Sequence, residues 1–366
     1  MKSYSYRPTI AIVLSLMLLF TVGLATQSVA TQPNQATFAS LELIDYAGMS
    51  TSNIAGFIAT LSRQNITGFT IRINAFNDWS RGTPSSSTVS TAKNIITEST
   101  SKNITVNVDL HTWYTTWDNY FRDSASNHNS NRAKYITFVK ASITAFSGYP
   151  VGAWMVLNEP QARTASTSEN NFILSIIAAA KSVTSKPVSV RFMAGYSPTT
   201  GHYSAAIDKA CDFISRNTYW DPRTPATSKY GTTNAKMNTV IASAKAADKE
   251  LWITEFGKSK SSLEGQRSYV EAFVTYANTK EIPRVYCWVA KPIGGSSESY
   301  NIFNGYTPNP AFYELKNTVA PPPPPPTTYQ ATITNTGTGN LYIDNELLSP
   351  GQTRNITVND TITVTK

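Results

Sequence analysis

The sequence predicts an α/β protein built on a (β/α)8 TIM barrel, and three observations support this fold class. Eight short apolar runs alternate with amphipathic segments of helical spacing over about 280 residues, the size of one such barrel. The runs are rich in Val, Ile and aromatic residues, which suit pleated strands. The first strand-to-helix turn, DYAGMSTSN, lacks the Gly-rich phosphate turn of a doubly wound sheet, so we favour the barrel over that rival.

The elements can be assigned in chain order. The expected strands are residues 41–46, 68–74, 104–110, 151–158, 187–193, 212–219, 250–256 and 282–289. Amphipathic spacing predicts helices that include residues 53–63, 133–146, 169–183 and 265–279, with a last helix around 309–319.

The barrel, assigned to residues 31–320, follows an N-terminal targeting segment at 1–30. Lys2 and Arg7 precede an apolar stretch of about 17 residues, and Ser28-Val29-Ala30 has the small residues of a cleavage site. We favour a cleaved signal peptide, with an uncleaved membrane anchor as the alternative. In both cases the rest of the chain is expected outside the cytoplasm, secreted or at the cell surface.

A proline-rich linker at 321–328 follows the barrel, because six consecutive prolines form a stiff polyproline II spacer. Residues 329–366 alternate polar and β-branched residues around Gly and Asn turns, which predicts a small all-β C-terminal module. Only Tyr329 and Tyr342 could stack on a sugar there. A structural or surface-attachment role is therefore favoured over carbohydrate binding.

Composition narrows the classes of function. The formal charge is +8, and loss of Lys2 and Arg7 would leave about +6 (8 − 2). The basic residues are scattered without a Lys/Arg run, so no nucleic-acid partner is expected. Charged residues make up 15% of the chain, a low share typical of exported proteins. Cys211 and Cys287 lie in apolar strand-like contexts and are expected as two buried free thiols rather than a disulfide.

Polar and aromatic residues gather at the ends of the predicted strands. The C-terminal ends of barrel strands face one shared cleft, so these side chains are expected to meet there. They are Arg72, His111, Asn158, Glu159, Asn217, Tyr219, Trp220, Glu255 and Trp288. Trp113, with Trp79, Tyr114 and Trp117, follows strand ends in loops, where exposed rings could contact sugar faces or pack within the loops.

Two of these residues suggest the chemistry. Glu159 ends the fourth strand in VGAWMVLNEP, and Glu255 ends the seventh in ELWITEF, so their carboxylates can face each other across the cleft. Paired carboxylates about 5–5.5 Å apart perform retaining glycoside hydrolysis. Structural alternatives remain for each: a helix N-terminal carboxylate for Glu159 and half of a buried ion pair for Glu255.

The motifs Asn158-Glu159-Pro160 and Thr254-Glu255-Phe256-Gly257 resemble those of clan A glycoside hydrolases, and within that clan most resemble glycoside hydrolase family 5. The resemblance covers roughly residues 38–319. It implies Glu159 as acid/base and Glu255 as nucleophile. The substrate-binding residues it implies or suggests are Arg72, His111, Asn158, Asn217, Tyr219, Trp220, Trp288 and Trp113. The family commonly has His where this chain has Asn217.

We therefore expect an exported retaining β-glycosidase, endo-acting on a β-1,4-linked glucan, with β-mannan or another β-glycan as the alternative substrate. From other classes, a non-catalytic glycan-binding barrel or a structural surface protein stays open. The expected partner is a β-linked polysaccharide or oligosaccharide, with possible surface attachment, and the chain is expected to act as a monomer. No cofactor is expected, and no metal site, because His128 and His202 lack partners at metal-ligand spacing.

Overall fold

The computed structural model describes residues 37–112, 114–160, 165–198, 201–225, 231–259, 261–291 and 299–315, together with parts of the tail between 329 and 365. By internal contacts the chain divides into two units, Gln35–Thr318 and a second unit made of Met1–Asn34 with Val319–Lys366. The predicted targeting segment (1–30) and linker (321–328) lie outside the described residues.

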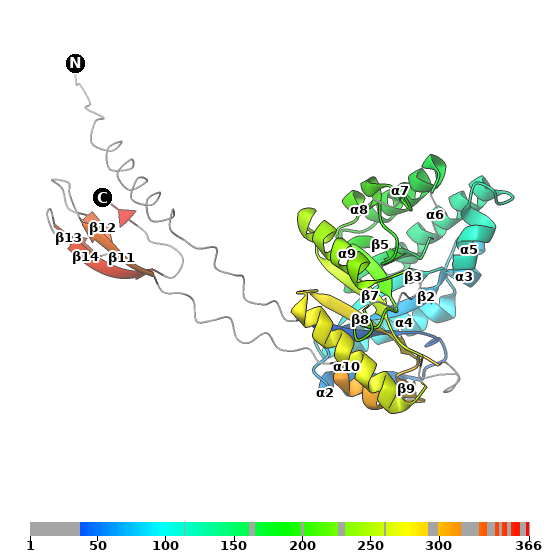
Figure 1. Cartoon of the computed structure of the whole chain (residues 1–366), viewed down its shortest axis with the longest axis horizontal. Coiled ribbons are helices and arrows are strands. Elements are labelled where there is room, and N and C mark those ends of the chain that lie inside the picture. Colours follow the sequence, from blue (N-terminus) through cyan, green and yellow to red (C-terminus); the bar gives the residue numbers. More distant parts are fainter. Residues whose placement is uncertain are drawn as a thin grey trace, which may run out of the picture. The chain divides into compact units, whose positions relative to one another are not determined.

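Eight parallel strands close into a barrel in sequence order, with the helices around it (Figure 1). This confirms the predicted (β/α)8 architecture. The strands are β1 (Phe38–Leu43), β2 (Gly68–Asn74), β3 (Thr105–His111), β4 (Val151–Asn158), β5 (Val188–Met193), β6 (Ile214–Thr218), β7 (Leu251–Phe256) and β8 (Arg284–Ala290).

The main helices that follow the strands are α2 (Thr51–Arg63), α4 (Ser86–Ser101), α6 (His128–Ala145), α7 (Thr167–Lys181), α8 (Ala205–Ala210), α9 (Asn234–Ala246) and α10 (Leu263–Thr279). Shorter turns are α3 (Ala75–Asp78), η1 (Trp79–Arg81), α5 (Tyr114–Thr116), the π-helical η2 (Trp117–Phe121) and η4 (Pro310–Glu314). A short hairpin, β9 (Phe303–Asn304) with β10 (Thr307–Pro308), lies between β8 and η4. The local sequence determines where several helices begin. Ser166 and Glu169, for example, form a complete capping box at α7.

Two predicted elements differ from the structure. The first strand ends at Leu43 rather than at residue 46, since Asp45 adopts a positive φ of 52° that leaves the extended conformation. The helix expected around 309–319 is only the 3₁₀ turn η4, because Leu315 returns to an extended conformation. Residues 316–319 lie outside the described part of the chain.

Register shifts near the ends of β4 and β7 aim polar side chains into the barrel. In β4, Met155 packs with an inner apolar cluster while Val156 and Leu157 join the outer core. Asn158 then comes back to the inside, three residues after Met155, which a regular strand with a period of two would not allow. The shift in β7 similarly places both Thr254 and Glu255 on the inner side. Bulges are common beside active sites because they re-aim side chains in this way.

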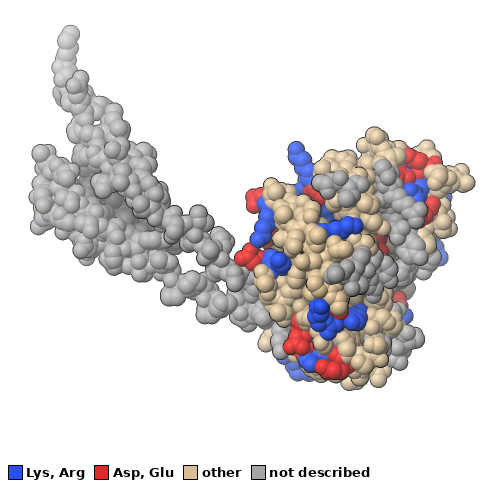
Figure 2. Space-filling model, in the orientation of Figure 1, with Lys and Arg blue, Asp and Glu red and all other residues tan. Residues whose placement is uncertain are grey.

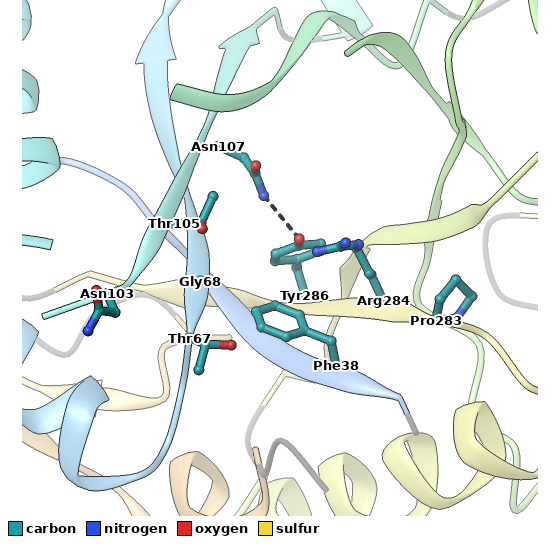
Figure 3. Close-up of a pocket in the computed structure, with 9 residues that line it drawn as sticks. All are labelled: Phe38, Thr67, Gly68, Asn103, Thr105, Asn107, Pro283, Arg284 and Tyr286. Atoms are coloured by element: carbon teal, nitrogen blue, oxygen red, sulfur yellow. Dashed lines mark hydrogen bonds between the residues drawn. The ribbon is translucent and has the colours of Figure 1, made fainter. Parts of the chain in front are cut away.

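The opposite, N-terminal end of the barrel holds aromatic residues and a cavity of about 400 Å³ (Figure 3). Phe213 stacks on Trp252 with ring centroids 3.9 Å apart, and Tyr286 packs beside Trp252. Figure 3 shows Asn107 donating a hydrogen bond to the Tyr286 hydroxyl, at 3.0 Å, next to Phe38. This end is therefore lined mainly by uncharged side chains, with Arg284 and Glu250 paired beside Trp252.

The surface agrees with the composition. On the face shown in Figure 2, basic and acidic residues are interspersed within a largely uncharged surface. Cys211 and Cys287 are buried free thiols, as predicted. None of the helices in the described residues is both long enough and apolar enough to cross a membrane.

The described parts of the tail are β-strands. Strand β11 (Tyr329–Thr334) pairs antiparallel with β14 (Thr353–Val358). Strand β12 (Leu341–Ile343) pairs with β13 (Glu346–Leu348) and with β15 (Val364–Thr365). The predicted all-β module as a whole stays a prediction, because the residues between these strands lie outside the described part of the chain.

Candidate active site

Glu255 stands at the centre of a cluster of charged groups at the C-terminal end of the barrel. It comes from the shifted end of β7 and is 2% exposed. The Tyr219 hydroxyl donates a hydrogen bond to Oε2 at 2.5 Å, and Arg191 Nη1 donates to Oε1 at 3.0 Å. Arg72 Nη2 lies 3.5 Å from the same Oε1. Of these partners, the sequence predicted Arg72 and Tyr219 at this site.

Glu159 follows β4 and is tied to the same site through Asn217. It has a positive φ of 44°, a left-handed conformation that costs energy for a residue with a side chain. Asn217 Nδ2 donates to Glu159 Oε1 at 2.9 Å, and Asn217 is the register partner of Glu255 in the β6–β7 pair. The Asn217 amide therefore holds Glu159, while the Asn217 backbone lies beside that of Glu255 in the sheet.

Asn158 is held by protein groups on both sides of its amide. Its Oδ1 accepts from Asn217 Nδ2 at 3.0 Å, and its Nδ2 donates to the carbonyl oxygen of Thr112 at 3.3 Å. The Thr112 hydroxyl in turn donates to the Asn158 carbonyl at 2.9 Å. The orientation of Asn158 is therefore fixed before any ligand is present.

His111 lies beneath this group rather than at its rim. It is 3% exposed, its Nδ1 is 3.0 Å from Asp109 Oδ2, and it lies 4.0 Å from Glu255 Oε1. Burial, followed by the positive charge of Arg72, holds the pKa of His111 well below its ordinary value. The imidazole is therefore neutral at pH 7.

Sequence reasoning missed three charged residues that complete the cluster. Glu42 on β1, Asp109 on β3 and Arg191 on β5 are each fully buried. Arg191 Nη1 lies 2.7 Å from Glu42 and 3.1 Å from Asp109, in addition to its contact with Glu255. The available signal was a single charged residue within an otherwise apolar strand, as in LEL, VDL and VRF.

An aromatic wall borders the carboxylates on the side of β8. The rings of Trp288 and Tyr219 meet edge-on at 6.0 Å, and Trp288 lies 5.0 Å from Tyr300. The Arg72 guanidinium is 5.9 Å from the Trp288 ring. The Trp288–Val289 peptide bond is cis. Tyr300 was not predicted as a site residue, because it follows the strand by ten positions.

Trp117 and Trp220 pack in the core and do not join this group. Trp220 is 1% exposed and packs edge-on against Tyr276 of α10, which suits core packing rather than substrate contact. Trp117 is likewise buried, against Phe172 of α7. Trp113 lies outside the described residues.

Burial shifts the two carboxyl groups in the same direction. It raises the pKa of Glu159 above 4.5, even though the Asn217 hydrogen bond opposes this shift. It also raises the pKa of Glu255, and the negative charge of Glu42 adds to the rise against Arg191 and Arg72. The sequence suggested only the influences that favour ionised Glu255, namely Arg72 and Tyr219.

Four potential metal ligands, Glu42, Asp109, His111 and Glu255, have ligand atoms within 4.8 Å of one another. The chemistry of the site does not fit a cation there. Arg191 Nη1 already lies within 3.1 Å of all three carboxylates, and Arg72 adds a second positive charge. The guanidinium groups occupy the electrostatic position that a metal ion would take.

Comparison with solved structures finds the same barrel fold in two mannanases and an endoglucanase. An endo-1,4-β-D-mannanase from Thermotoga petrophila RKU-1 matches with a TM-score of 0.56 and 15% identity, covering 76% of this chain and 98% of that chain. A GH113 β-1,4-mannanase matches at 0.59 and 13%, covering 76% and 98%. A GH5-4 broad specificity endoglucanase from Clostridium longisporum matches at 0.52 and 14%, covering 74% and 85%.

No protein-family model and no curated protein sequence matches the chain. This chain therefore shares the barrel fold of these glycoside hydrolases, in agreement with the predicted resemblance.

Proposed function

We propose that the protein is a retaining β-glycosidase in which Glu255 is the nucleophile and Glu159 the acid/base. The observation that carries the proposal is the pair of glutamates at the ends of β4 and β7, which are held by different groups: Glu159 by Asn217, the register partner of Glu255, and Glu255 by Arg191 and Tyr219. Glu255 accepts from a guanidinium and a phenol, whereas the described contact of Glu159 is a neutral amide. Donors to a carboxylate favour its charged form, and at Glu255 they oppose the burial and the Glu42 charge that raise its pKa to about 8.

The reaction then proceeds in two displacements. Glu255 forms a bond to the anomeric carbon while the glycosidic C–O bond breaks and Glu159 gives its proton to the leaving oxygen. Water next attacks the same carbon, gives a proton to Glu159, and releases Glu255 as a carboxylate. When Glu255 is esterified its negative charge is gone, so the pKa of Glu159 falls and it becomes the base.

The proposed substrate is a β-1,4-linked glucan cleaved internally, with β-mannan as the second candidate. The aromatic wall of Trp288, Tyr219 and Tyr300 offers ring faces and edges of the kind that contact pyranose rings. Mannan is included because two of the structural neighbours are named as mannanases. A screen on soluble β-glucan, mannan and xylan distinguishes these substrates, and inactivity on all three would support a binding barrel instead.

Azide rescue of two alanine variants tests the assignment of roles. On an aryl glycoside, Glu159→Ala should form the glycosyl-enzyme but stall, and azide should restore turnover with a β-glycosyl azide as product. Glu255→Ala should be inactive and yield, with azide, only the α-azide. General acid–base catalysis raises the rate about 10²–10⁴-fold, so the rates of the two variants should differ measurably. Equal behaviour of the two variants, or inverted product from the wild type, would contradict the roles.

We further propose that the protein is exported and acts as a monomer. This rests on the targeting segment at 1–30 and on the low charge of the chain. N-terminal sequencing of the exported protein tests cleavage after Ala30, and retention in the membrane fraction would instead favour the anchor.

A further inference from the structure

The buried charges around Glu255 form a closed set that its role as a nucleophile does not by itself explain. The set comprises the carboxylates of Glu42, Asp109 and Glu255 and the guanidinium groups of Arg72 and Arg191. Each of the five residues is at most 4% exposed. Water therefore screens these charges poorly, and the net charge of the set affects its electrostatic free energy.

Glu42 is the member that organises the two arginines. Its Oε1 accepts from Arg72 Nε at 2.8 Å, and its Oε2 accepts from Arg191 Nη1 at 2.7 Å. Both guanidinium groups also reach Glu255 Oε1, at 3.5 and 3.0 Å. Glu42 on β1 and Glu255 on β7 thus share the same two guanidinium groups. A change of charge on one carboxylate alters the strength of the ion pairs of the other.

The set is unbalanced in the free protein. With Glu255 ionised it contains three negative and two positive charges. The neighbouring His111 and Tyr219 are uncharged, because the pKa of His111 is held well below its ordinary value and that of Tyr219 well above. Conversion of Glu255 to an ester removes one negative charge. The two remaining carboxylates, Glu42 and Asp109, then match the two guanidinium groups, Arg72 and Arg191.

We propose that Glu42 is a positioning residue whose charge leaves the buried set neutral when Glu255 carries a glycosyl group and negative when Glu255 is a free carboxylate. This inference rests on the proposed function. It means that the site is electrostatically suited to the glycosyl-enzyme, whereas the free carboxylate of Glu255 stands in a surplus of negative charge. The surplus weakens the ion pairs of Arg72 and Arg191 with Glu255. Glu255 is then a better nucleophile.

The groups facing Glu255 come from every side of the barrel mouth. They are Glu42 from β1, Arg72 from β2, Asp109 and His111 from β3, Glu159 after β4, Arg191 from β5, and Tyr219 after β6. On β8 the neighbouring side chain is the uncharged Trp288. After burial, Glu42 is the largest cause of the raised pKa of Glu255, which agrees with the geometry.

Two substitutions at one position separate charge from shape. Glu42→Gln keeps the shape and removes the charge. In the pH profile of kcat/KM, the apparent pKa of the acid limb should fall by about one to two units, as expected for charges less than 5 Å apart in a buried site. Glu42→Gln should also slow formation of the glycosyl-enzyme and reduce the burst of aryl leaving group. Glu42→Asp keeps the charge, so its acid limb should remain near that of the wild type even if kcat falls.

Glu169→Gln is the matched control. Glu169 is a buried carboxylate, 4% exposed, whose described partners are the α7 cap and residues 122–123. Its replacement should leave the acid limb and the burst unchanged. An acid limb that does not move in Glu42→Gln, or one that moves equally in Glu42→Asp, would overturn the proposal.

Carboxyl ¹³C NMR of Glu255 in the intact protein gives a readout that needs no hydrolysis. Glu42→Gln should lower the pKa of Glu255 by a similar amount, with the signal assigned by its loss in Glu255→Gln. An unchanged titration overturns the coupling between Glu42 and Glu255. A shifted titration in a protein that hydrolyses no glycoside supports the coupling and contradicts the proposed function, so the two failures are distinguishable.

Discussion

The two ends of the barrel interior have opposite chemistry. The N-terminal end holds packed rings beside a cavity of about 400 Å³, with Trp252 between Phe213 and Tyr286, and Asn107 donates a hydrogen bond to Tyr286 there. The C-terminal end carries the buried charges around Glu255, with one negative charge in surplus. Packed rings stabilise a fold, whereas an unbalanced buried charge costs stability and is retained where chemistry needs it. The difference shows which end of one continuous interior is structural and which is functional.

The largest expected effect comes from neutralising the charged end. Glu255→Gln should reduce kcat/KM by about 10⁴–10⁶-fold, since the nucleophile is lost. The same substitution should raise the free energy of unfolding by about 1–2 kcal/mol at pH 8, because it removes the surplus charge. Activity assays and denaturant unfolding of the same preparation check both halves of this prediction.

The sign of the stability change follows from the raised pKa of Glu255. Ionisation of Glu255 in the folded state is unfavourable, so wild-type stability is fully present below about pH 4.5 and falls as pH rises through the raised value. The gain in Glu255→Gln should therefore disappear near pH 4. A variant that is less stable than the wild type at pH 8 would show that the charged end is balanced after all.

At the apolar end the expected change is in stability and not in chemistry. Trp252→Ala should lower the free energy of unfolding by about 3–5 kcal/mol, because it leaves a cavity beneath Phe213 and Tyr286. At a temperature where the variant is folded, its kcat/KM should remain within about threefold of the wild type. A large loss of activity in the folded variant would mean that the two ends are coupled.

Two tyrosines allow a finer comparison, since each loses only a hydroxyl group. Tyr219→Phe removes the donor to Glu255 Oε2, so it should raise the pKa of Glu255 further, move the acid limb of kcat/KM to higher pH, and reduce the rate about 10–100-fold. Tyr286→Phe removes the acceptor of Asn107 and should cost about 1 kcal/mol of stability with the acid limb unchanged. The pH dependence of kcat/KM of both variants tests whether the acid limb moves in Tyr219→Phe and stays unchanged in Tyr286→Phe.

The sequence predicts the positions of the strands and the two glutamates, but not how the charged end is balanced. Strand ends are readable because apolar runs stop at polar residues, as at Asn158 and Glu255. Glu42, Asp109 and Arg191 are single charges inside apolar runs, and their partners are separated by up to 149 residues, so no local pattern joins them.

At Trp220 the sequence predicts a cleft residue where the structure has a core residue, because Trp220 lies next to the site residue Tyr219. Neighbouring residues near a strand end point in different directions, and Trp220 turns toward α10 while Tyr219 turns toward Glu255. The shifts of register in β4 and β7 were equally hidden, since they depend on pairing with the adjacent strands. Side-chain direction at a bulge is set by tertiary contacts and not by the alternation of the sequence.

The smallest effect is expected outside the barrel. If chemistry belongs to the C-terminal end of the barrel alone, truncation after Ala320 should leave kcat/KM on a soluble substrate unchanged, because every candidate catalytic residue precedes Pro321. Thermal unfolding of the truncated protein provides the control that the barrel is intact. Loss of turnover in a folded truncation would place part of the active site in the tail. Reduced action on insoluble polymer alone would instead assign substrate binding to the β-module, because the soluble substrate does not require attachment to a surface.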